Sequence, residues 1–319
     1  LQDRQTLETS REYPALAHRL YQSLIEEVLP RLPKQVLIVP DAWLSALPFE
    51  ALYTRPGGMD WAEAPFALQE ADFHYAFSLS VLEQQRALPA DAAEGLLHFA
   101  PRFLDGARGI PTLMQAKSEI PDSWEATSFL DTAASWQRLQ RLSGRYRILH
   151  LSTHGFASDS LPRIELYDRA AYLPDIYALP LGAELVVLGA CETGLGVFKQ
   201  GEGVMSLSRA FTYAGSRGLV YSLWSINESA TGRLLRQMYK QLAIPQGKAQ
   251  ALAEAKRSYL KSEEIPSFQK SPYYWASLVY AGEPGHLSQL PGKQGGMGYW
   301  LFALAGLAGV LFAIRLRRA

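Results

Sequence analysis

Two stretches decide the fold of this chain: Ile148-Leu-His-Leu-Ser-Thr-His-Gly155 and Leu185-Val-Val-Leu-Gly-Ala-Cys-Glu-Thr-Gly194. Each is an apolar, strand-like run that reaches a reactive side chain, His154 or Cys191, and then breaks into a loop that contains glycine. In open parallel sheets, ligands bind in the crevice outside the carboxyl ends of the strands. We therefore predict that the two runs are neighbouring strands whose ends form one site.

Working outward from these strands, the sequence predicts an alternation of strands and helices. Further strands are expected at 35–39, 48–53, 73–80, 95–100, 127–130, 219–224 and 274–281. Helices are expected at 1–32, 113–119, 132–142, 203–213, 227–242 and 247–261, and a polar irregular stretch at 157–175. This alternation indicates an α/β layered fold, with a mostly parallel central sheet that is flanked by helices.

The composition excludes several classes of protein. Among 319 residues, 31 Lys and Arg balance 31 Asp and Glu, so the chain lacks the basic excess that is typical of nucleic-acid-binding proteins. Cys191 is the only cysteine, which excludes an intrachain disulfide and a cysteine-rich zinc module. The first residue is Leu rather than Met, so we expect a processed amino end with further protein upstream.

The carboxyl-terminal segment resembles a membrane anchor. Residues 297–314 are uncharged and would span about 27 Å as a helix, close to the roughly 30 Å of a bilayer core. Tyr299 and Trp300 lie at the amino-terminal edge of this run, and the basic tail 315–319 follows it. We therefore predict a flexible linker at 283–296 and a single transmembrane helix at 297–314. The basic tail favours a cytoplasmic carboxyl end, with the rest of the chain on the periplasmic side, over the reverse orientation.

The first of the two strands presents three polar side chains on one face. His150, Ser152 and His154 alternate with apolar residues, but only His154 lies at the strand end. A thiol with a pKa of about 8.5 becomes a better nucleophile when a neighbouring imidazole accepts its proton. His154 and Cys191 therefore suit acyl transfer, with the backbone N–H groups of Gly155 and Cys191 as donors to the oxyanion.

Two other kinds of site fit the residues less well. A metal site from His74, His150, His154 and Cys191 lacks any close ligand spacing, so no metal and no cofactor are expected. The glycine-rich loop 194–203 lacks both the dinucleotide-binding pattern and a GK[ST] ending. We interpret it as a loop that shapes the site and opens a helix near Gly203.

Several motifs, in order, resemble the CHAT domain, a caspase-like, separase-related group of clan CD cysteine peptidases. They are STHG at 152–155, LVVLGACETGLG at 185–196, GEGVMSLSRAF at 201–211 and SLWSIN at 222–227. The runs 37–41, 47–52 and 272–276 resemble the edges of that domain, so the resemblance spans about residues 20–282. We accordingly expect a helical segment at 1–32 and a caspase-like peptidase domain at 33–282. The histidine precedes the cysteine, as in caspase-like enzymes.

The resemblance implies roles for individual residues. His154 and Cys191 would form the catalytic dyad, and Gly155 would contribute to the oxyanion hole. An acidic pocket for a basic P1 side chain would draw on nearby residues. The candidates for that pocket are Asp159, Asp175, Glu192, Ser222 and Trp224. Two mild departures from the family pattern are Gly189, where Ser is common, and the Phe156-Ala157 pair after the HG motif.

The expected function is a membrane-anchored cysteine endopeptidase that cleaves a specific protein after a basic residue, in bacterial signalling, stress or defence. The alternatives are a catalytically silent scaffold or signalling module of the same fold, and a small-molecule acyl transferase or hydrolase that uses the same dyad. The expected partners are a protein substrate, an upstream tetratricopeptide-repeat region with its own binding partners, and a membrane through residues 297–314.

Overall fold

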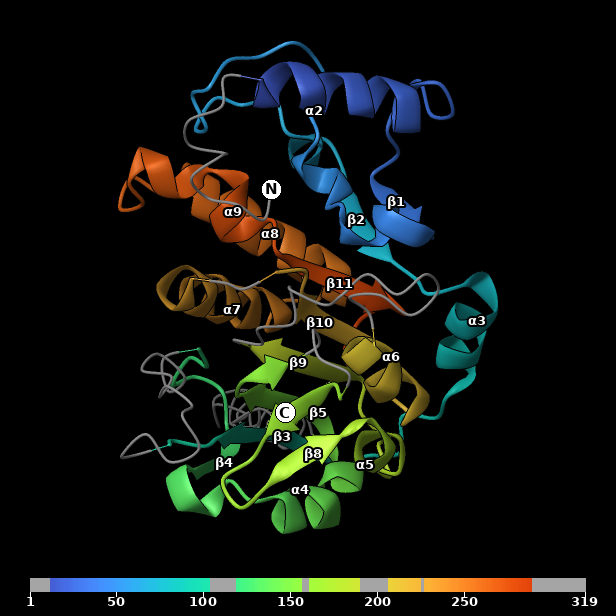
Figure 1. Cartoon of the computed structure of the whole chain (residues 1–319), viewed down its shortest axis with the longest axis vertical. Helices are drawn as coiled ribbons and strands as arrows, with labels where there is room; N and C mark the ends of the chain where they lie inside the picture. The colour runs from blue at the N-terminus through green and yellow to red at the C-terminus, as the bar shows by residue number, and fades with distance from the viewer. Residues whose placement is uncertain (1–11, 104–118, 157–160, 190–205, 225–226, 289–319) are drawn as a thin grey trace, which may run out of the picture. The chain divides into compact units, whose positions relative to one another are not determined.

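The computed structural model describes residues 12–103, 119–156, 161–189, 206–224 and 227–288. The chain divides into two compact units, residues 1–288 and residues 289–319. The second unit lies outside the described residues, so the fold described below is that of the first (Figure 1).

Within the described residues, eight strands form one sheet in the order β1-β2-β11-β10-β9-β5-β3-β4 (Figure 1). Their bounds are β1 Gln35–Ile38, β2 Asp72–Tyr75, β3 Glu94–Ala100, β4 Ala126–Leu130, β5 Tyr146–Ser152, β9 Leu185–Gly189, β10 Gly218–Ser222 and β11 Leu278–Gly282. In this described sheet, every neighbouring pair is parallel except β10 and β11. The prediction of an α/β fold with a mostly parallel sheet is confirmed.

The antiparallel pair separates two parallel blocks that run in opposite directions. One block contains β1, β2 and β11, and the other contains β10, β9, β5, β3 and β4. The carboxyl ends of β5 and β9 therefore lie at the same edge of the sheet. Ser152 at the end of β5 is the Cα partner of Gly189 at the end of β9, so the two ends are level. All of β9 is buried, which explains its unbroken apolar run.

Helices cover both faces of the sheet. Their bounds are α2 Tyr13–Tyr21, α3 Leu79–Ala87, α4 Trp136–Leu142, α5 Leu173–Tyr177, α6 Ser206–Tyr213, α7 Glu228–Leu242, α8 Lys248–Lys261 and α9 Pro272–Trp275. α7 contacts α8 and β9, and α8 contacts β2 and β11, whereas α6 contacts β10. Figure 1 shows α7 and α8 on one side of the sheet and α3 and α6 on the other.

The start of α7 follows the sequence expectation closely. The side chain of Asn227 accepts a hydrogen bond of 3.0 Å from the backbone N–H of Ala230, which satisfies one of the amides that a helix start leaves without a partner. The helix then buries an apolar stripe that includes Leu235 and Met238. The cap and the stripe together place α7 against β9.

A second, smaller sheet follows β5 directly. Within the described residues it contains β6 Gly155–Phe156, β7 Arg163–Glu165 and β8 Ala170–Tyr172, all antiparallel. The sequence predicted an irregular stretch here, because strands of two or three residues are too short to show an alternating pattern. The small sheet extends the chain beyond the end of β5 and so surrounds His154.

Three of the predicted strands are wrong in part. The strand expected at 73–80 ends at Tyr75, and Leu79 begins α3. Residues 48–53 form a 3₁₀-helix at Phe49–Ala51 instead of a strand, because a short buried apolar run has the same appearance in either structure. The strand expected at 274–281 begins only at Leu278. Its first residues belong to α9, where Pro272 occupies the first helical position.

The expectation of a membrane-anchored localisation is also corrected. Among the residues that the structure describes, no helix is long and apolar enough to cross a membrane. Of the described helices, α7 has 15 residues, or about 22 Å, which is short of a bilayer core, and it carries charged side chains. The run 297–314, on which the expectation was based, lies outside the described residues.

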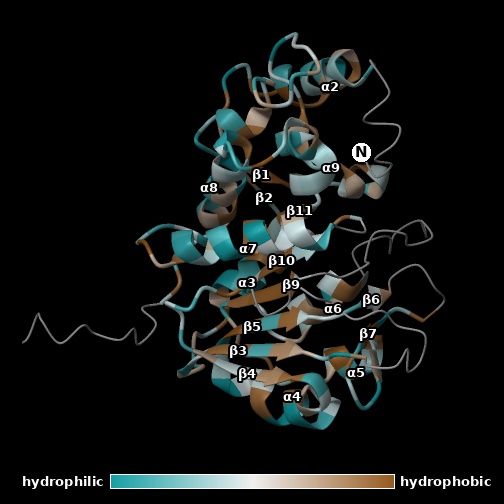
Figure 2. Ribbon diagram, turned by 90° about the vertical axis from the view of Figure 1, so that its left-hand side faces the viewer, coloured by the Kyte–Doolittle hydropathy of each residue, from teal (hydrophilic) through white to brown (hydrophobic). Residues whose placement is uncertain are grey.

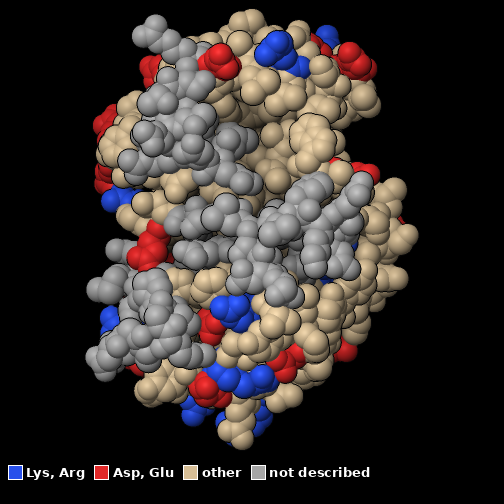
Figure 3. Space-filling view, viewed as in Figure 1, with Lys and Arg blue, Asp and Glu red and all other residues tan. Residues whose placement is uncertain are grey.

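The distribution of polar residues has two informative features. On the face shown in Figure 3, basic side chains lie beside acidic ones rather than in one basic patch. Inside the molecule, the strands of the central sheet are mostly hydrophobic, but a hydrophilic band crosses β3 and β5 (Figure 2). β3 and β5 carry the buried histidines His98 and His150.

Candidate functional site

His154 lies just beyond the carboxyl end of β5, as predicted. Its side chain is enclosed, with only 4% of the residue exposed. Two phenyl rings lie near the imidazole, whose centroid is 6.4 Å from that of Phe103 and 6.4 Å from that of Phe156. His154 thus packs near aromatic side chains on both neighbouring segments of the chain, Phe103 after β3 and Phe156 on β6.

The small sheet also orients the backbone on both sides of His154. The N–H of Glu165 donates a 2.9 Å hydrogen bond to the carbonyl oxygen of His154. Gly155 is the register partner of Ile164, one step further along the ladder. Hydrogen-bonded and non-hydrogen-bonded pairs alternate in an antiparallel ladder, so the N–H of Gly155 points away from β7. This direction suits a donor to a substrate oxyanion, although that role stays a prediction.

Side-chain contacts reinforce this frame around His154. The hydroxyl of Thr153 donates to the carbonyl oxygen of Glu165. Arg163 forms a 2.8 Å ion pair with the Glu165 carboxylate, and its guanidinium lies 4.5 Å from the centroid of the Phe156 ring. The residues that flank His154 are thus held by hydrogen bonds, by an ion pair and by a cation–π contact.

Cys191 lies outside the described residues, as do two of the pocket candidates, Asp159 and Glu192. The described part of β9 ends at Gly189, two positions before Cys191 in the sequence. Since Gly189 is level with Ser152, the dyad residues follow their paired strand ends by the same number of positions. The dyad itself stays a prediction.

The other three pocket candidates lie at separate places. Asp175 accepts hydrogen bonds from Arg169, at 2.8 and 3.1 Å, and from the N–H of Tyr172 at 2.9 Å. The hydrogen bond from Arg169 lowers the pKa of this carboxyl, which is already engaged at the start of α5. Ser222 ends β10 and Trp224 follows it; both are buried, and the Trp224 indole donates to the carbonyl oxygen of Tyr273.

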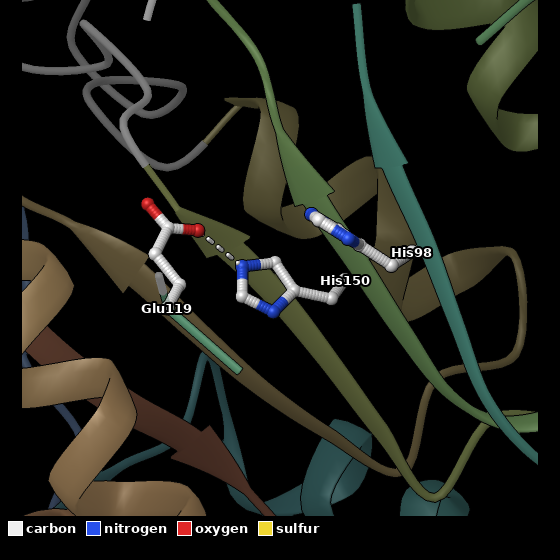
Figure 4. A group of neighbouring side chains, drawn as sticks. All are labelled: His98, Glu119 and His150. Atoms are coloured by element: carbon white, nitrogen blue, oxygen red, sulfur yellow. Dashed lines mark ion pairs between the residues drawn. The ribbon is translucent and has the colours of Figure 1, made fainter. Parts of the chain in front are cut away.

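A buried cluster beneath the strand ends was not anticipated from the sequence. Glu119, which precedes β4, directs its carboxylate at β5 (Figure 4). Its Oε2 atom lies 2.8 Å from Nε2 of His150 and also accepts a hydrogen bond from the hydroxyl of Ser152. Glu119 is 2% exposed, and His150 and Ser152 have no exposed surface. The sequence analysis had placed His150 and Ser152 on one face but had given them no acidic partner.

Two further side chains complete this cluster. Nε2 of His98 on β3 lies 3.1 Å from the Ser152 hydroxyl, and the hydroxyl of Tyr239 on α7 lies 2.9 Å from Nδ1 of His150. Burial, and next the nearby charge on His150, lower the pKa of His98 well below its ordinary value. His98 is therefore neutral at physiological pH.

His98, Glu119 and His150 also form a group whose ligand atoms lie within 4.8 Å of one another. The Ser152 hydroxyl lies among these atoms and hydrogen-bonds to all three residues. A hydrogen-bonded network therefore accounts for the geometry better than a metal centre does. The metal-binding combination weighed from the sequence is not brought together, because β11, β10 and β9 separate His74 on β2 from His150 on β5.

Comparisons with known proteins agree with this architecture. The family model described as CHAT domain matches residues 14–283. Separase from Saccharomyces cerevisiae, in its complex with securin, is similar in structure with a TM-score of 0.53 at 11% identity, over 86% of this chain and 18% of the separase chain. The Arg-specific cysteine proteinase gingipain R is similar with a TM-score of 0.53 at 10% identity, over 87% of this chain and 68% of that chain.

This chain thus spans less than a fifth of the length of separase. At such identities, the similarity concerns the fold alone. The curated protein sequences yield no match to this chain.

Proposed function

Because this chain belongs to the CHAT domain family, we propose that it is a cysteine endopeptidase in which His154 and Cys191 form the catalytic dyad. The observation that carries this proposal is the level pairing of Ser152 with Gly189, because the dyad residues follow these two partners by equal numbers of positions. The fold shared with the cysteine proteinase gingipain R supports the same reaction class.

The proposed reaction is an acyl transfer in two steps. His154 accepts the proton of the Cys191 thiol, and the thiolate attacks the scissile carbonyl carbon of the substrate. The N–H groups of Gly155 and Cys191 stabilise the resulting oxyanion. As the intermediate collapses, the peptide C–N bond breaks and His154 returns the proton to the leaving amine. A water molecule, deprotonated by His154, then hydrolyses the thioester and regenerates the thiol.

We further propose a protein substrate that is cut after a basic residue. The named specificity of gingipain R supports the basic P1 side chain. Among the acids considered for the pocket, Asp175 is held by Arg169 and by the Tyr172 N–H. The proposal therefore assigns recognition of the basic side chain to Asp159 or Glu192, both of which flank the dyad in the sequence.

Hydrolysis of fluorogenic peptides with Arg, Lys, Leu or Asp at P1 tests this proposal. Peptides with Arg and Lys are expected to be cleaved fastest. His154→Ala is expected to lower kcat by about 10²–10⁴-fold, as for loss of a general base, and Cys191→Ala should abolish cleavage. Asp159→Asn or Glu192→Gln should weaken the preference for Arg, whereas Asp175→Asn, the matched control, should not.

Three outcomes would overturn the proposal. Cleavage that persists in Cys191→Ala would refute the dyad. A folded protein that cleaves no peptide would favour the catalytically silent scaffold. Turnover of small thioesters or esters without any peptide cleavage would favour the small-molecule acyl transferase or hydrolase.

A further inference from the structure

We propose that Glu119 is a positioning residue, whose carboxylate holds the ends of β5 and β9 in register and so aligns Cys191 with His154. The inference rests on the proposed function, since it assigns Glu119 a role in the same dyad. Glu119 acts through the backbone of the two strands and does not itself touch the substrate.

The first contact is with β5. The Glu119 carboxylate binds the side chains of His150 and Ser152, which lie on the same face of the strand, two positions apart. Ser152 is the last residue of β5, and His154 follows it by two positions. The carboxylate therefore fixes the part of β5 from which the His154 segment departs (Figure 4).

The second contact is with β9. A Cβ atom placed on Gly189 would lie 3.0 Å from Oε2 of Glu119, 3.0 Å from Nε2 of His150 and 3.2 Å from a methyl carbon of Leu235. Such distances are tighter than nine in ten real Cβ contacts, so a side chain at 189 would require the carboxylate and the imidazole to shift by a few tenths of an ångström. This explains why glycine, which has no side chain, stands at position 189. The last residue of β9 thus packs its backbone directly against the Glu119–His150 pair.

The remaining contacts make the carboxylate rigid. The hydroxyl of Tyr239 is hydrogen-bonded to Nδ1 of His150, and the two rings are stacked at a centroid distance of 5.6 Å. The Trp124 indole donates a 2.9 Å hydrogen bond to the Tyr239 carbonyl oxygen, which ties the segment that carries Glu119 to α7. Dyad geometry is sensitive at this level, since a shift of about 1 Å at a reacting group costs about 10²-fold in rate.

The test uses Cys191 as its own reporter. It is the only cysteine in the chain, so alkylation of the whole protein by iodoacetamide measures its reactivity without any substrate. At pH 6.5 an unpaired thiol with a pKa of about 8.5 is roughly 1% thiolate, so pairing with an imidazole raises the rate by about 10- to 100-fold. Glu119→Gln is expected to remove most of this gain and to approach the rate of His154→Ala.

Two matched variants separate positioning from general stability. Glu50→Gln alters another carboxylate that is 2% exposed and ion-paired, but on the opposite block of the sheet; it should leave the alkylation rate and its pH profile unchanged. Gly189→Ala keeps Glu119 but adds a methyl group in the space of the carboxylate, and it should slow alkylation as Glu119→Gln does. If Glu119→Gln fails to fold, Gly189→Ala still tests the proposal.

The outcomes are distinguishable. The positioning role would be overturned, and the dyad left intact, if His154→Ala slowed the alkylation of Cys191 but Glu119→Gln and Gly189→Ala, each tested singly, reacted at the wild-type rate. Wild type and His154→Ala at the same slow rate would overturn the dyad, and with it the positioning role. Equal slowing by Glu50→Gln and Glu119→Gln would show that Glu119 has only a structural role. For peptide cleavage, Glu119→Gln should lower kcat with little change in KM.

Discussion

Two buried carboxylates, Glu50 and Glu119, have nearly the same surroundings but lie on opposite blocks of the sheet. Each is 2% exposed and each binds one basic side chain and one hydroxyl. Glu50 pairs with Lys256 at 2.7 Å and accepts from the hydroxyl of Tyr75. Glu119 pairs with His150 at 2.8 Å and accepts from the hydroxyl of Ser152. Burial and pairing alone therefore do not identify a functional group.

The difference lies in what each carboxylate holds together. Glu50 joins α8 to β2, in the block formed by β1, β2 and β11, and its partner is Lys256 on α8. Glu119 lies where β5 and β9 end, and its partner is His150 on β5 itself. We infer that the first pair stabilises the fold, and that the second also sets the geometry of the candidate site.

The largest effect on stability is expected when the Glu50–Lys256 pair is broken. Lys256→Ala leaves Glu50 buried without its cation, so the free energy of unfolding should fall by about 3–5 kcal/mol in urea titrations. The alkylation rate of Cys191 in the remaining folded protein should stay unchanged. In the double variant Glu50→Leu/Lys256→Met, most of the stability should return, because both charges are then gone. A loss below about 1 kcal/mol in Lys256→Ala would contradict a structural role for this pair.

The pH dependence of stability provides a further test in the block formed by β1, β2 and β11, where His74 lies on β2. Burial, and next the positive charge of Arg86, lower the pKa of His74 to about 4 in the folded protein, against about 6.5 when unfolded. Between these values the unfolded chain binds more protons, so this histidine reduces stability as the pH falls from 6.5 to 4, by about 3 kcal/mol. His74→Gln should flatten this part of the stability profile, and an unchanged slope would refute the assignment.

A smaller effect on stability is expected when the space around the Glu119–His150 pair is altered. Gly189→Ala forces a methyl group against Glu119 and His150, so the free energy of unfolding should fall by about 1–3 kcal/mol. Gly95→Ala on β3 is the control. A Cβ atom added at Gly95 would lie at an ordinary 3.7 Å from its nearest neighbouring atom, the carbonyl oxygen of Glu125. Thermal unfolding measures both. Equal effects of the two substitutions would mean that the space beside Gly189 is not filled as described.

Local pattern predicted much of this fold, and long-range contacts account for most of what it missed. The apolar runs that became β1, β3 and β10 carry their own signal, and α7 spans Glu228–Leu242 where a helix was expected at 227–242. The run 48–53 failed because short buried apolar segments do not distinguish a strand from a 3₁₀-helix. The small sheet failed because its strands have two or three residues each.

The same distinction between local pattern and long-range contacts applies to the candidate site. The position of His154 beyond a strand end could be read from local alternation and from the following glycine. The Glu119 network could not, because its hydrogen bonds join residues that are 33 and 89 positions apart in the chain. The one local trace of the network is Gly189, which had been noted as a departure from the family pattern, and whose missing side chain is explained by the carboxylate beside it.

The most direct test of the central claim is the mass of the intact protein after reaction with a chloromethyl ketone on an Arg-terminated peptide. The wild type should gain one adduct, mapped to Cys191, and the reaction should be at least about tenfold slower in His154→Ala. An adduct that forms in Cys191→Ala, or an equal rate in wild type and His154→Ala, would contradict a His154–Cys191 peptidase.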